Sequence, residues 1–320
     1  MKQAKLVVIL ILPLLVWGWA ACGQQAQQSN GFSSFQNKND LPVVLPDSSI
    51  KPLRNLVNSK LESQLQKTIT ANKKWKRLVS QKKMAIGLVD LQDVYNIKFA
   101  RINGNHMMYA ASLPKISILL ATMDAFEKGE MEETDEIYAD LNAMISKSDN
   151  LASTRMIDRL SFKKIESVMT DPQYEFYDED FGGGLWVGKR YASAGQRYPE
   201  PIKGLSHAAT ASQVSRFYYL MATGRLVNPE RSRQMLEIMD NPALHHKFVN
   251  ILEKKAPKAR LFRKSGSWRT YHSDSILVWG PSRRYILVAI VDDPNGEKII
   301  RQLVEPVEGV LNDYIKSRNN

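Results

Sequence analysis

The sequence predicts an α/β fold of the α+β type, in which an antiparallel sheet is flanked by helices and carries an inserted all-helical lobe. Three observations predict it. Strand-like segments stand near both ends of the chain, the long segment between them has helical periodicity, and a hairpin pattern joins two of the last strands. The two ends are therefore expected to build one sheet layered with helices, and the middle to be a helical insertion.

The first elements are a helix and two strands. Residues 53–82 are mostly helix-forming, and their large apolar side chains recur at roughly helical spacing, at Leu56, Leu61, Leu65, Ile69 and Trp75. Residues 84–89 are β-rich, residues 94–101 follow as the next strand-like segment, and Asn103-Gly104 is a turn signal.

The middle of the chain is mainly helical. Residues 112–126 predict a strongly apolar helix, and residues 137–160, 210–224 and 228–240 predict further helices. Residues 171–201 have an irregular composition that is acidic at first, then contains Gly182-Gly183-Gly184, and is finally basic and aromatic. This stretch predicts loops rather than regular elements.

The chain ends in strands and a helix. Residues 275–279 and 285–291 flank Gly280-Pro281-Ser282, which is a hairpin pattern, and residues 299–315 predict a final amphipathic helix. One domain is therefore expected over residues 51–320. Its sheet lobe comprises about 51–110 and 257–320, and its helical lobe about 111–256.

Composition restricts the class of protein. The 320 residues are 43% hydrophobic and 24% charged, which is typical of globular proteins and disfavours disorder, collagen and coiled coil. Lys and Arg number 44 against 33 Asp and Glu, so the net charge of +11 would suit an anionic partner such as an envelope polymer. The basic residues are scattered without interleaved aromatic blocks, so no nucleic-acid partner is expected. A single cysteine and five histidines disfavour a metal site.

The N-terminus has the pattern of an export signal. Lys2 and Lys5 precede an apolar run at residues 6–17, which is too short to span a bilayer comfortably. The following Trp19-Ala20-Ala21-Cys22-Gly23 resembles the lipobox of bacterial lipoproteins, which implies a signal peptide at 1–21 and lipidation of Cys22. Simple secretion and an uncleaved anchor stay open. Residues 22–50 predict a flexible tether, and the expected location is the cell envelope, on a membrane facing the periplasm or the exterior.

Three short motifs suggest the chemistry of an activated serine. Ser112-Leu113-Pro114-Lys115 opens the apolar helix, Ser148-Asp149-Asn150 follows, and Lys264-Ser265-Gly266 precedes Trp268 in a strand-like stretch. A residue three positions along a helix shares its face, so Lys115 can reach the Ser112 hydroxyl. Apolar neighbours lower the pKa of a lysine by desolvation, and such a lysine can act as the base that a serine nucleophile needs.

The other motif residues have matching roles. Ser148 can pass a proton to a leaving nitrogen, and Asn150 can hold a substrate carbonyl. Lys264 and Ser265 can hold a substrate carboxylate, next to Gly266. The backbone N–H groups of Ser112 and Ser267 are the expected oxyanion donors. Each motif alone is more often a helix cap, a turn or a loop, and only the three in this order favour the catalytic interpretation.

Taken together, the motifs resemble those of the serine β-lactamase and penicillin-binding protein superfamily, nearest to its class A branch, from about residue 84 to 315. The segments His207-Ala208-Ala209-Thr210-Ala211 and Leu261-Phe262-Arg263 also resemble parts of that branch. The resemblance implies a β-lactamase-like fold, and a monomer that forms an acyl-serine with penicillin-like lactams or D-Ala-D-Ala peptides. It implies no metal and no cofactor.

One class A feature is missing. That branch carries a Glu-x-x-Leu-Asn motif whose glutamate activates the deacylating water, and no such motif occurs here. Glu200, in Tyr198-Pro199-Glu200-Pro201, lies nearest the expected place, although a solvated loop carboxylate is the favoured alternative. The other acidic candidates between Asn150 and His207 are Glu175, Asp178, Glu179 and Asp180. An acyl group is therefore expected to persist, so two hypotheses stand: a serine hydrolase, or a non-hydrolytic penicillin- or peptidoglycan-binding lipoprotein.

Other patterns are weaker. Residues 183–189 spell G-x-x-x-x-G-K, but Arg190 stands where a phosphate-binding loop needs Ser or Thr, so a glycine loop beside the cleft is favoured. A Ser/His/Asp triad through His207 or His272 is an alternative that stays open. Four aromatic residues could line a substrate groove, although aromatic residues at this density more often belong to the core. They are Trp186, Tyr191, Trp268 and Tyr271.

Overall fold

The computed structural model describes residues 41–319 of the chain, and the side chains to residue 314. The predicted signal peptide, Cys22 and most of the predicted tether lie outside the described residues. Residues 41–50 are not a free tether: Leu41 and Leu45 are buried, and the Val43 N–H donates to the Ala222 carbonyl at 2.7 Å. The apolar side chains of this segment explain why it packs on the folded body.

An antiparallel sheet of five strands confirms the predicted fold class. Its strands stand in the order β2 (Lys98–Ile102), β1 (Met84–Asp90), β10 (Arg284–Asp292), β9 (Tyr271–Trp279) and β8 (Arg260–Trp268). The two ends of the chain therefore meet at the β1–β10 pair. β8 is an edge strand whose only neighbour in the sheet is β9.

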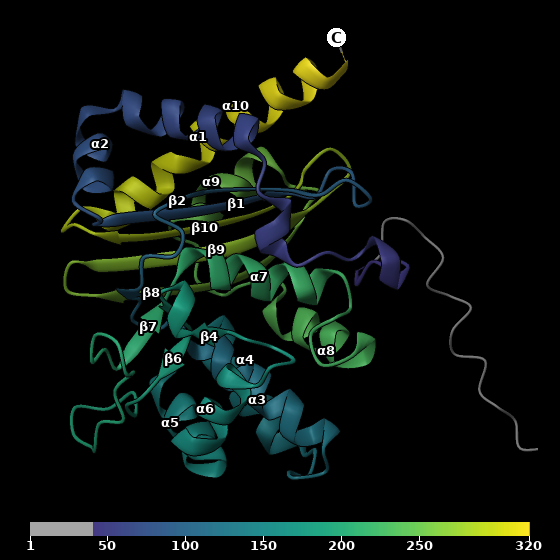
Figure 1. The fold of residues 1–320 in the computed structure, drawn as a ribbon. Helices are drawn as coiled ribbons and strands as arrows, with labels where there is room; N and C mark the ends of the chain where they lie inside the picture. The colour runs from purple at the N-terminus through teal and green to yellow at the C-terminus, as the bar shows by residue number, and fades with distance from the viewer. Residues whose placement is uncertain (1–40, 320) are drawn as a thin grey trace, which may run out of the picture. The chain divides into compact units, whose positions relative to one another are not determined.

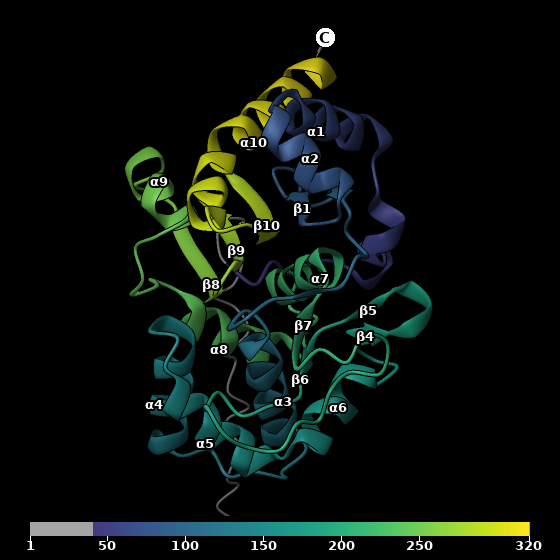
Figure 2. The same ribbon diagram turned by 90° about the vertical axis from the view of Figure 1, so that its left-hand side faces the viewer.

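Helices cover both faces of this sheet (Figures 1 and 2). On one face lie α1 (Ser59–Ala71), α2 (Lys73–Ser80), α9 (Phe248–Lys255) and α10 (Gly296–Asn319), and on the other lies α7 (Ala211–Ala222). The side chains of β10 alternate between the two layers: Ile286, Val288 and Ile290 join the core with α7, and the intervening residues join the core with α1 and α10. This alternation has the two-residue period of a strand buried on both faces.

The helical lobe lies beyond α7 (Figure 1). It contains α3 (Lys115–Glu127), α4 (Asp135–Ser146), α5 (Asn150–Leu160), α6 (Phe162–Thr170) and α8 (Pro229–Met239). The expected helix over 137–160 is two helices, because Ser148 has a φ of 58° and Asp149 caps α5 by accepting from the Ala152 N–H at 2.7 Å. α9 falls within the segment predicted as helical lobe, yet it packs against α10 and the sheet.

Residues 171–209 are less irregular than the sequence predicts. Short strands form there, paired either with each other or with β3 (Met108–Tyr109); they are β4 (Tyr177–Asp178), β5 (Gly183–Gly184), β6 (Trp186–Val187) and β7 (His207–Ala209). Single 3₁₀ turns complete the fold, at η1 (Asp47–Ser49), η2 (Leu53–Leu56) and η3 (Glu179–Phe181). Within the described residues, no helix is both long and apolar enough to cross a membrane.

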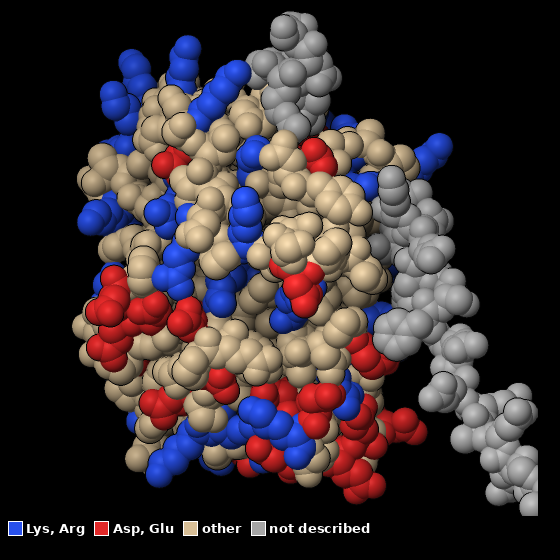
Figure 3. Space-filling model, turned by 45° about the vertical axis from the view of Figure 1, so that its right-hand side comes forward, with Lys and Arg blue, Asp and Glu red and all other residues tan. Residues whose placement is uncertain are grey.

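Charge is unevenly distributed on the face drawn in Figure 3. Lys and Arg gather at the end of the sheet and its outer helices, and Asp and Glu gather at the end of the helical lobe. The net charge of +11 is therefore not a uniform field, and the charge around any one site has to be taken from the residues there.

We expect Gly87→Ala to destabilise the fold, because α7 rests directly on this position of β1. A Cβ at Gly87 would lie 2.2 Å from Ser215 Oγ and 3.0 Å from the Ala211 carbonyl oxygen, so the helix would have to move. Overpacking of this kind costs about 2 kcal/mol, and we expect the melting temperature to fall by about 5 °C.

Gly309→Ala in α10 is the matched control for thermal melts followed by circular dichroism. A Cβ there meets nothing within 4 Å, so the substitution should stabilise the helix by up to about 1 kcal/mol. Equal melting temperatures for the two variants would contradict the close contact between α7 and the sheet.

Candidate active site

Ser112 lies in the turn that leads into α3. The Leu113 N–H donates to the Ala110 carbonyl at 3.1 Å, and the Lys115 N–H donates to the Ser112 carbonyl at 3.3 Å. Ala111 has a φ of 52°, an unusual value for a residue with a Cβ, so the backbone is held in a sharp bend just before the serine. Lys115 follows as the first residue of α3.

The Lys115 side chain connects the first motif to the second. It is fully buried, and its Nζ donates to the Ser148 carbonyl at 2.7 Å, the Asp149 carbonyl at 3.1 Å and Asn150 Oδ1 at 2.9 Å. Burial lowers the pKa of Lys115 to about 7, although the nearby Asp149 carboxylate acts in the opposite direction. Near neutral pH this amine therefore exists in both its protonated and its neutral form.

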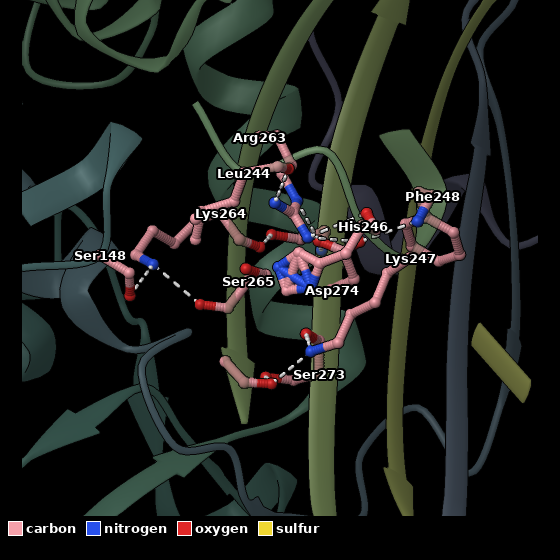
Figure 4. Close-up of polar contacts among 12 residues, drawn as sticks. Ser148, Leu244, His246, Lys247, Phe248, Arg263, Lys264, Ser265, Ser273 and Asp274 are labelled. Atoms are coloured by element: carbon pink, nitrogen blue, oxygen red, sulfur yellow. Dashed lines mark hydrogen bonds and ion pairs between the residues drawn. The ribbon is translucent and has the colours of Figure 1, made fainter. Parts of the chain in front are cut away.

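Lys264 connects the third motif to the second from the opposite side. It lies on β8, is 1% exposed, and its Nζ donates to Ser148 Oγ at 2.9 Å and to the Ser265 carbonyl at 2.8 Å (Figure 4). Burial, and then the charge of Lys115, hold the pKa of Lys264 well below its usual value. Ser148 therefore accepts a hydrogen bond from Lys115 at its carbonyl and another from Lys264 at its hydroxyl.

Gly266 brings β8 against the turn that carries Ser112. A Cβ at this position would lie 2.4 Å from the Ala110 carbonyl oxygen and 2.6 Å from the Ser112 nitrogen, so only glycine permits the approach. The next residue, Ser267, is exposed near the end of β8. β8 is an edge strand whose Phe262 forms an isolated bridge with Asp240, and the rest of this edge can pair with an amide-like substrate.

A cavity of about 800 Å³ opens over these residues. Ser112, Asn150 and Ser267 line it together with the loop between β6 and β7 and the turn between β8 and β9. The other lining residues are Tyr109, Ala111, Lys189, Arg190, Tyr191, Ala192, Ser193, Arg197, Leu205, Ser206, His207, Trp268, Arg269 and Tyr271. The structure therefore places predicted residues from all three motifs around one cavity or in direct contact with its walls.

Lys247 is a supporting residue that sequence reasoning missed. It is fully buried, has a φ of 55°, and its Nζ donates to the Gly266 carbonyl at 2.6 Å, Ser267 Oγ at 2.9 Å and the Ser273 carbonyl at 3.0 Å. Burial lowers the pKa of Lys247 to about 8. The lysine holds the end of β8 from behind, and no local pattern in His245-His246-Lys247 indicates this role.

A buried ion pair supports the same strand (Figure 4). Arg263 Nε lies 2.7 Å from Asp274 Oδ1, with both side chains at most 2% exposed. Asp274 Oδ2 also accepts from the Phe248 N–H at 3.1 Å, and the Arg263 guanidinium donates to the Leu244 carbonyl at 2.8 Å. The pair thereby fixes the segment that carries Lys247 to β8 and β9.

Glu200 is neither a solvated loop carboxylate nor a wall of the cavity. It is 1% exposed, and its oxygens accept from the backbone N–H groups of Ile202, Lys203 and Leu205 at 2.7–3.0 Å and from the Tyr177 hydroxyl at 2.7 Å. Both oxygens are engaged in closing the turn at 200–205, so the structure argues against its suggested role as deacylation base. Among the described residues, no Asp or Glu lines the cavity.

Among the described residues, no hydrogen bond or ion pair joins a carboxylate to either histidine of the suggested triad. His207 Nε2 lies 3.0 Å from the Lys189 carbonyl and Nδ1 lies 3.1 Å from Ser206 Oγ, and burial lowers the pKa of His207 to about 4. His272 Nδ1 lies 3.5 Å from Ser267 Oγ. Within the described residues neither ring is bonded to an Asp or Glu, so the triad interpretation is not supported.

The aromatic candidates divide into two groups. Tyr191, Trp268 and Tyr271 line the cavity, whereas Trp186 is 3% exposed and packs against Tyr177 in the core. The glycine segment 183–188 is held in strands β5 and β6, and Lys189 at its end lines the cavity. Residues 183–188 do not themselves line the cavity, and the segment leads to the cavity wall at Lys189.

Comparison with known proteins gives a family and a fold. The sequence profile of the Beta-lactamase enzyme family matches residues 60–140 and 139–307. A beta-lactamase from Sphaerobacter thermophilus DSM 20745 has a TM-score of 0.60 at 16% identity, over 78% of this chain and 95% of that one. A beta-lactamase from Chitinophaga pinensis DSM 2588 has a TM-score of 0.61 at 15% identity, and the match covers 79% of this chain and 99% of that one.

A third similar structure is a mutant of PBP-A, solved as an acyl-enzyme complex with penicillin G. Its TM-score is 0.57 at 19% identity, over 82% of this chain and all of that one. At these identities the likeness to solved structures concerns the fold alone. No curated protein matches the chain.

Proposed function

This chain belongs to the beta-lactamase enzyme family, and from that premise we propose that it is a serine hydrolase whose Ser112 forms an acyl-enzyme with β-lactams or D-Ala-D-Ala-like peptides. One observation carries the proposal. Two buried lysines from separate segments meet at Ser148, and Gly266 brings the strand of the second lysine against the backbone of Ser112. The two weakly solvated amines thus meet at Ser148, the proposed proton relay, while β8 lies against the backbone of Ser112, the proposed nucleophile, and these are the groups that nucleophilic catalysis uses.

The proposed acylation needs no group beyond those at the site. Neutral Lys115 accepts the hydroxyl proton as Ser112 Oγ bonds to the substrate carbonyl carbon, and the N–H groups of Ser112 and Ser267 hold the resulting oxyanion. The C–N bond then breaks, and the leaving nitrogen takes a proton from Ser148 Oγ. The proton that Lys115 accepted returns to Ser148, so the net product is an ester on Ser112 and an amine, which departs from a peptide and stays attached in an opened lactam.

Deacylation is the slow step in this proposal. Hydrolysis of the ester needs a base to activate water, and no carboxylate among the described residues lines the cavity. The penicillin acyl-enzyme solved for the PBP-A mutant supports a lactam as the acyl donor. The absence of a carboxylate from the described cavity walls favours the second candidate function, a penicillin-binding protein of the cell envelope with little or no turnover.

We expect a fluorescent penicillin to label the full chain covalently. The label should disappear in Ser112→Ala, because the nucleophile is gone, and fall by at least about 100-fold in rate in Lys115→Met, because the proton acceptor is gone. Intact-mass spectrometry after denaturation measures the adduct. We expect most of it to remain after about an hour, since unassisted hydrolysis is slow.

Lys128→Met, at the exposed end of α3, is the control for these variants. It removes an amine of the same kind from the C-cap of α3, where Lys128 pairs with Asp124 at 3.0 Å, and should leave labelling unchanged. Labelling that survives in Ser112→Ala would sink the proposed nucleophile. Loss of the adduct within seconds would show efficient turnover, and the absence of any adduct would exclude the proposed reaction with lactams.

The acylation rate should rise with pH through about 7. Lys115 must be neutral to accept the proton, and its lowered pKa of about 7 makes the neutral form predominant only above that pH. Stopped-flow or quenched labelling with benzylpenicillin between pH 5 and 9 measures this dependence, with circular dichroism at each pH to confirm that the chain stays folded. A rate that is constant from pH 5 to 8 would contradict Lys115 as the base.

We also propose that the protein is a lipoprotein of the cell envelope. The support is the N-terminal pattern alone, with its basic start, apolar run and Ala20-Ala21-Cys22. This location agrees with a reaction on envelope peptides or on lactams that reach them.

Lipidation can be tested by fractionating cells that express the full chain. The native chain should sediment with membranes and leave them only with detergent, whereas Cys22→Ala should be soluble or retain an uncleaved N-terminus. A native chain that is released by salt alone would argue against a lipid anchor, because a lipid is held by apolar burial rather than by charge.

A further inference from the structure

The outer part of the catalytic cavity carries an excess of positive charge. Lys189, Arg190, Arg197 and Arg269 all line it, and no Asp or Glu of the described chain does. Arg190, Arg197 and Arg269 are exposed and Lys189 is half-buried, so their charged groups are accessible from solvent. The cavity therefore has a cationic rim, defined by these four residues.

Three of the four rim cations are not neutralised. Lys189 Nζ donates to the Ser193 carbonyl at 3.2 Å, an Arg197 guanidinium nitrogen donates to the Gly204 carbonyl at 2.7 Å, and Arg269 lies over the Trp268 ring at 5.6 Å. Between residues 41 and 319 none of these three has a carboxylate partner. Arg190 alone is paired, with Asp158 at 2.6 Å.

The rim is distinct from the cations of the catalytic chemistry. Lys115 and Lys264 are buried, and their amines are engaged with oxygen atoms of the protein. Aromatic side chains at Tyr109, Tyr191 and Tyr271 also line the cavity and contact one another or His207, with ring centroids 4.4–5.9 Å apart. The cavity therefore offers apolar surface for the body of a substrate as well as charge at its rim.

Electrostatics decides which substrates such a cavity favours. A cleft lined by charge of one sign concentrates the field within low-dielectric walls and can raise association rates by about 10–1000-fold for ligands of the opposite sign. Guanidinium groups also bind carboxylates through two parallel hydrogen bonds. A cationic side chain on the substrate would instead be repelled.

We propose that the preferred acyl donor is an acidic one, with an anionic group on its acyl side that is held by the cationic rim, in addition to the carboxylate expected beside Lys264 and Ser265. This inference rests on the proposed function, since the rim surrounds the cavity of Ser112. It adds a substrate class: peptides or lactams whose acyl half carries a carboxylate.

Three penicillins that differ in one substituent test the proposal. Benzylpenicillin, carbenicillin and ampicillin carry hydrogen, carboxylate and ammonium at the same side-chain carbon. The second-order rate of acylation of the full chain is measured for each by competition with a fluorescent penicillin and by intact mass. We expect carbenicillin to react fastest and ampicillin slowest, with about tenfold between them at low salt and a smaller ratio at about 1 M salt.

Charge-removing variants locate the effect. The triple variant Lys189→Gln, Arg197→Gln, Arg269→Gln should reduce the carbenicillin-to-ampicillin ratio to near one. The control triple Lys60→Gln, Lys67→Gln, Lys73→Gln removes the same net charge from exposed positions on α1 and α2 and should keep the ratio. A ratio rather than a rate is compared, so a general loss of activity does not imitate the result.

The outcomes separate the two proposals. Equal rates for the three penicillins, with Ser112 acylated by all, would overturn the acidic substrate class and leave the proposed function standing. Loss of the ratio in the control triple would also overturn it, because net charge rather than the rim would then be responsible. No acylation by any of the three would overturn the proposed function, and this inference with it.

Discussion

Buried amines that form no ion pair with a carboxylate of the described residues are the constraint on which the site depends. Lys115, Lys247 and Lys264 are at most 1% exposed, and their nitrogens donate to carbonyl, amide and hydroxyl oxygens. Withdrawal from water disfavours the charged form of an amine, and neutral acceptors compensate less than a carboxylate would. Desolvation of Lys115 costs stability, and it also lowers the pKa of this lysine to about 7, where the neutral amine can accept a proton.

Strand alternation distributes these groups over the two layers of the molecule. Successive side chains of β8 point to opposite faces, so Lys264 reaches Ser148 in the helical lobe while Arg263 reaches Asp274 and the segment before α9. Because Lys247 then holds Gly266 and Ser267 from the same rear side, the strand is fixed before any substrate arrives. Catalytic groups that are held in advance need no reorganisation during the reaction.

The sequence allowed the fold class and the three motifs to be predicted because both signals are local. The apolar run at 285–291 and the turn at 280–282 identify the hairpin, and Lys115 is three positions from Ser112. Long-range roles left no such signal: Lys247 is bonded to residues 19 to 26 positions away. The environment of Glu200 could not be predicted, because its partners are backbone N–H groups at 202–205, and backbone donors leave no pattern in the sequence. The helices α6 and α9 are short, and their periodicity was too brief to recognise.

No Asp or Glu of the described chain lines the cavity, and this has a consequence for how such a protein could evolve. A glutamate acquired near Ser112 would supply the missing activation of water. The same negative charge would also favour the ammonium form of Lys115, as the Asp149 carboxylate already does. In the proposed reaction, faster release of the acyl group would therefore come with slower attack by Ser112, and the two half-reactions would have to be improved by separate substitutions.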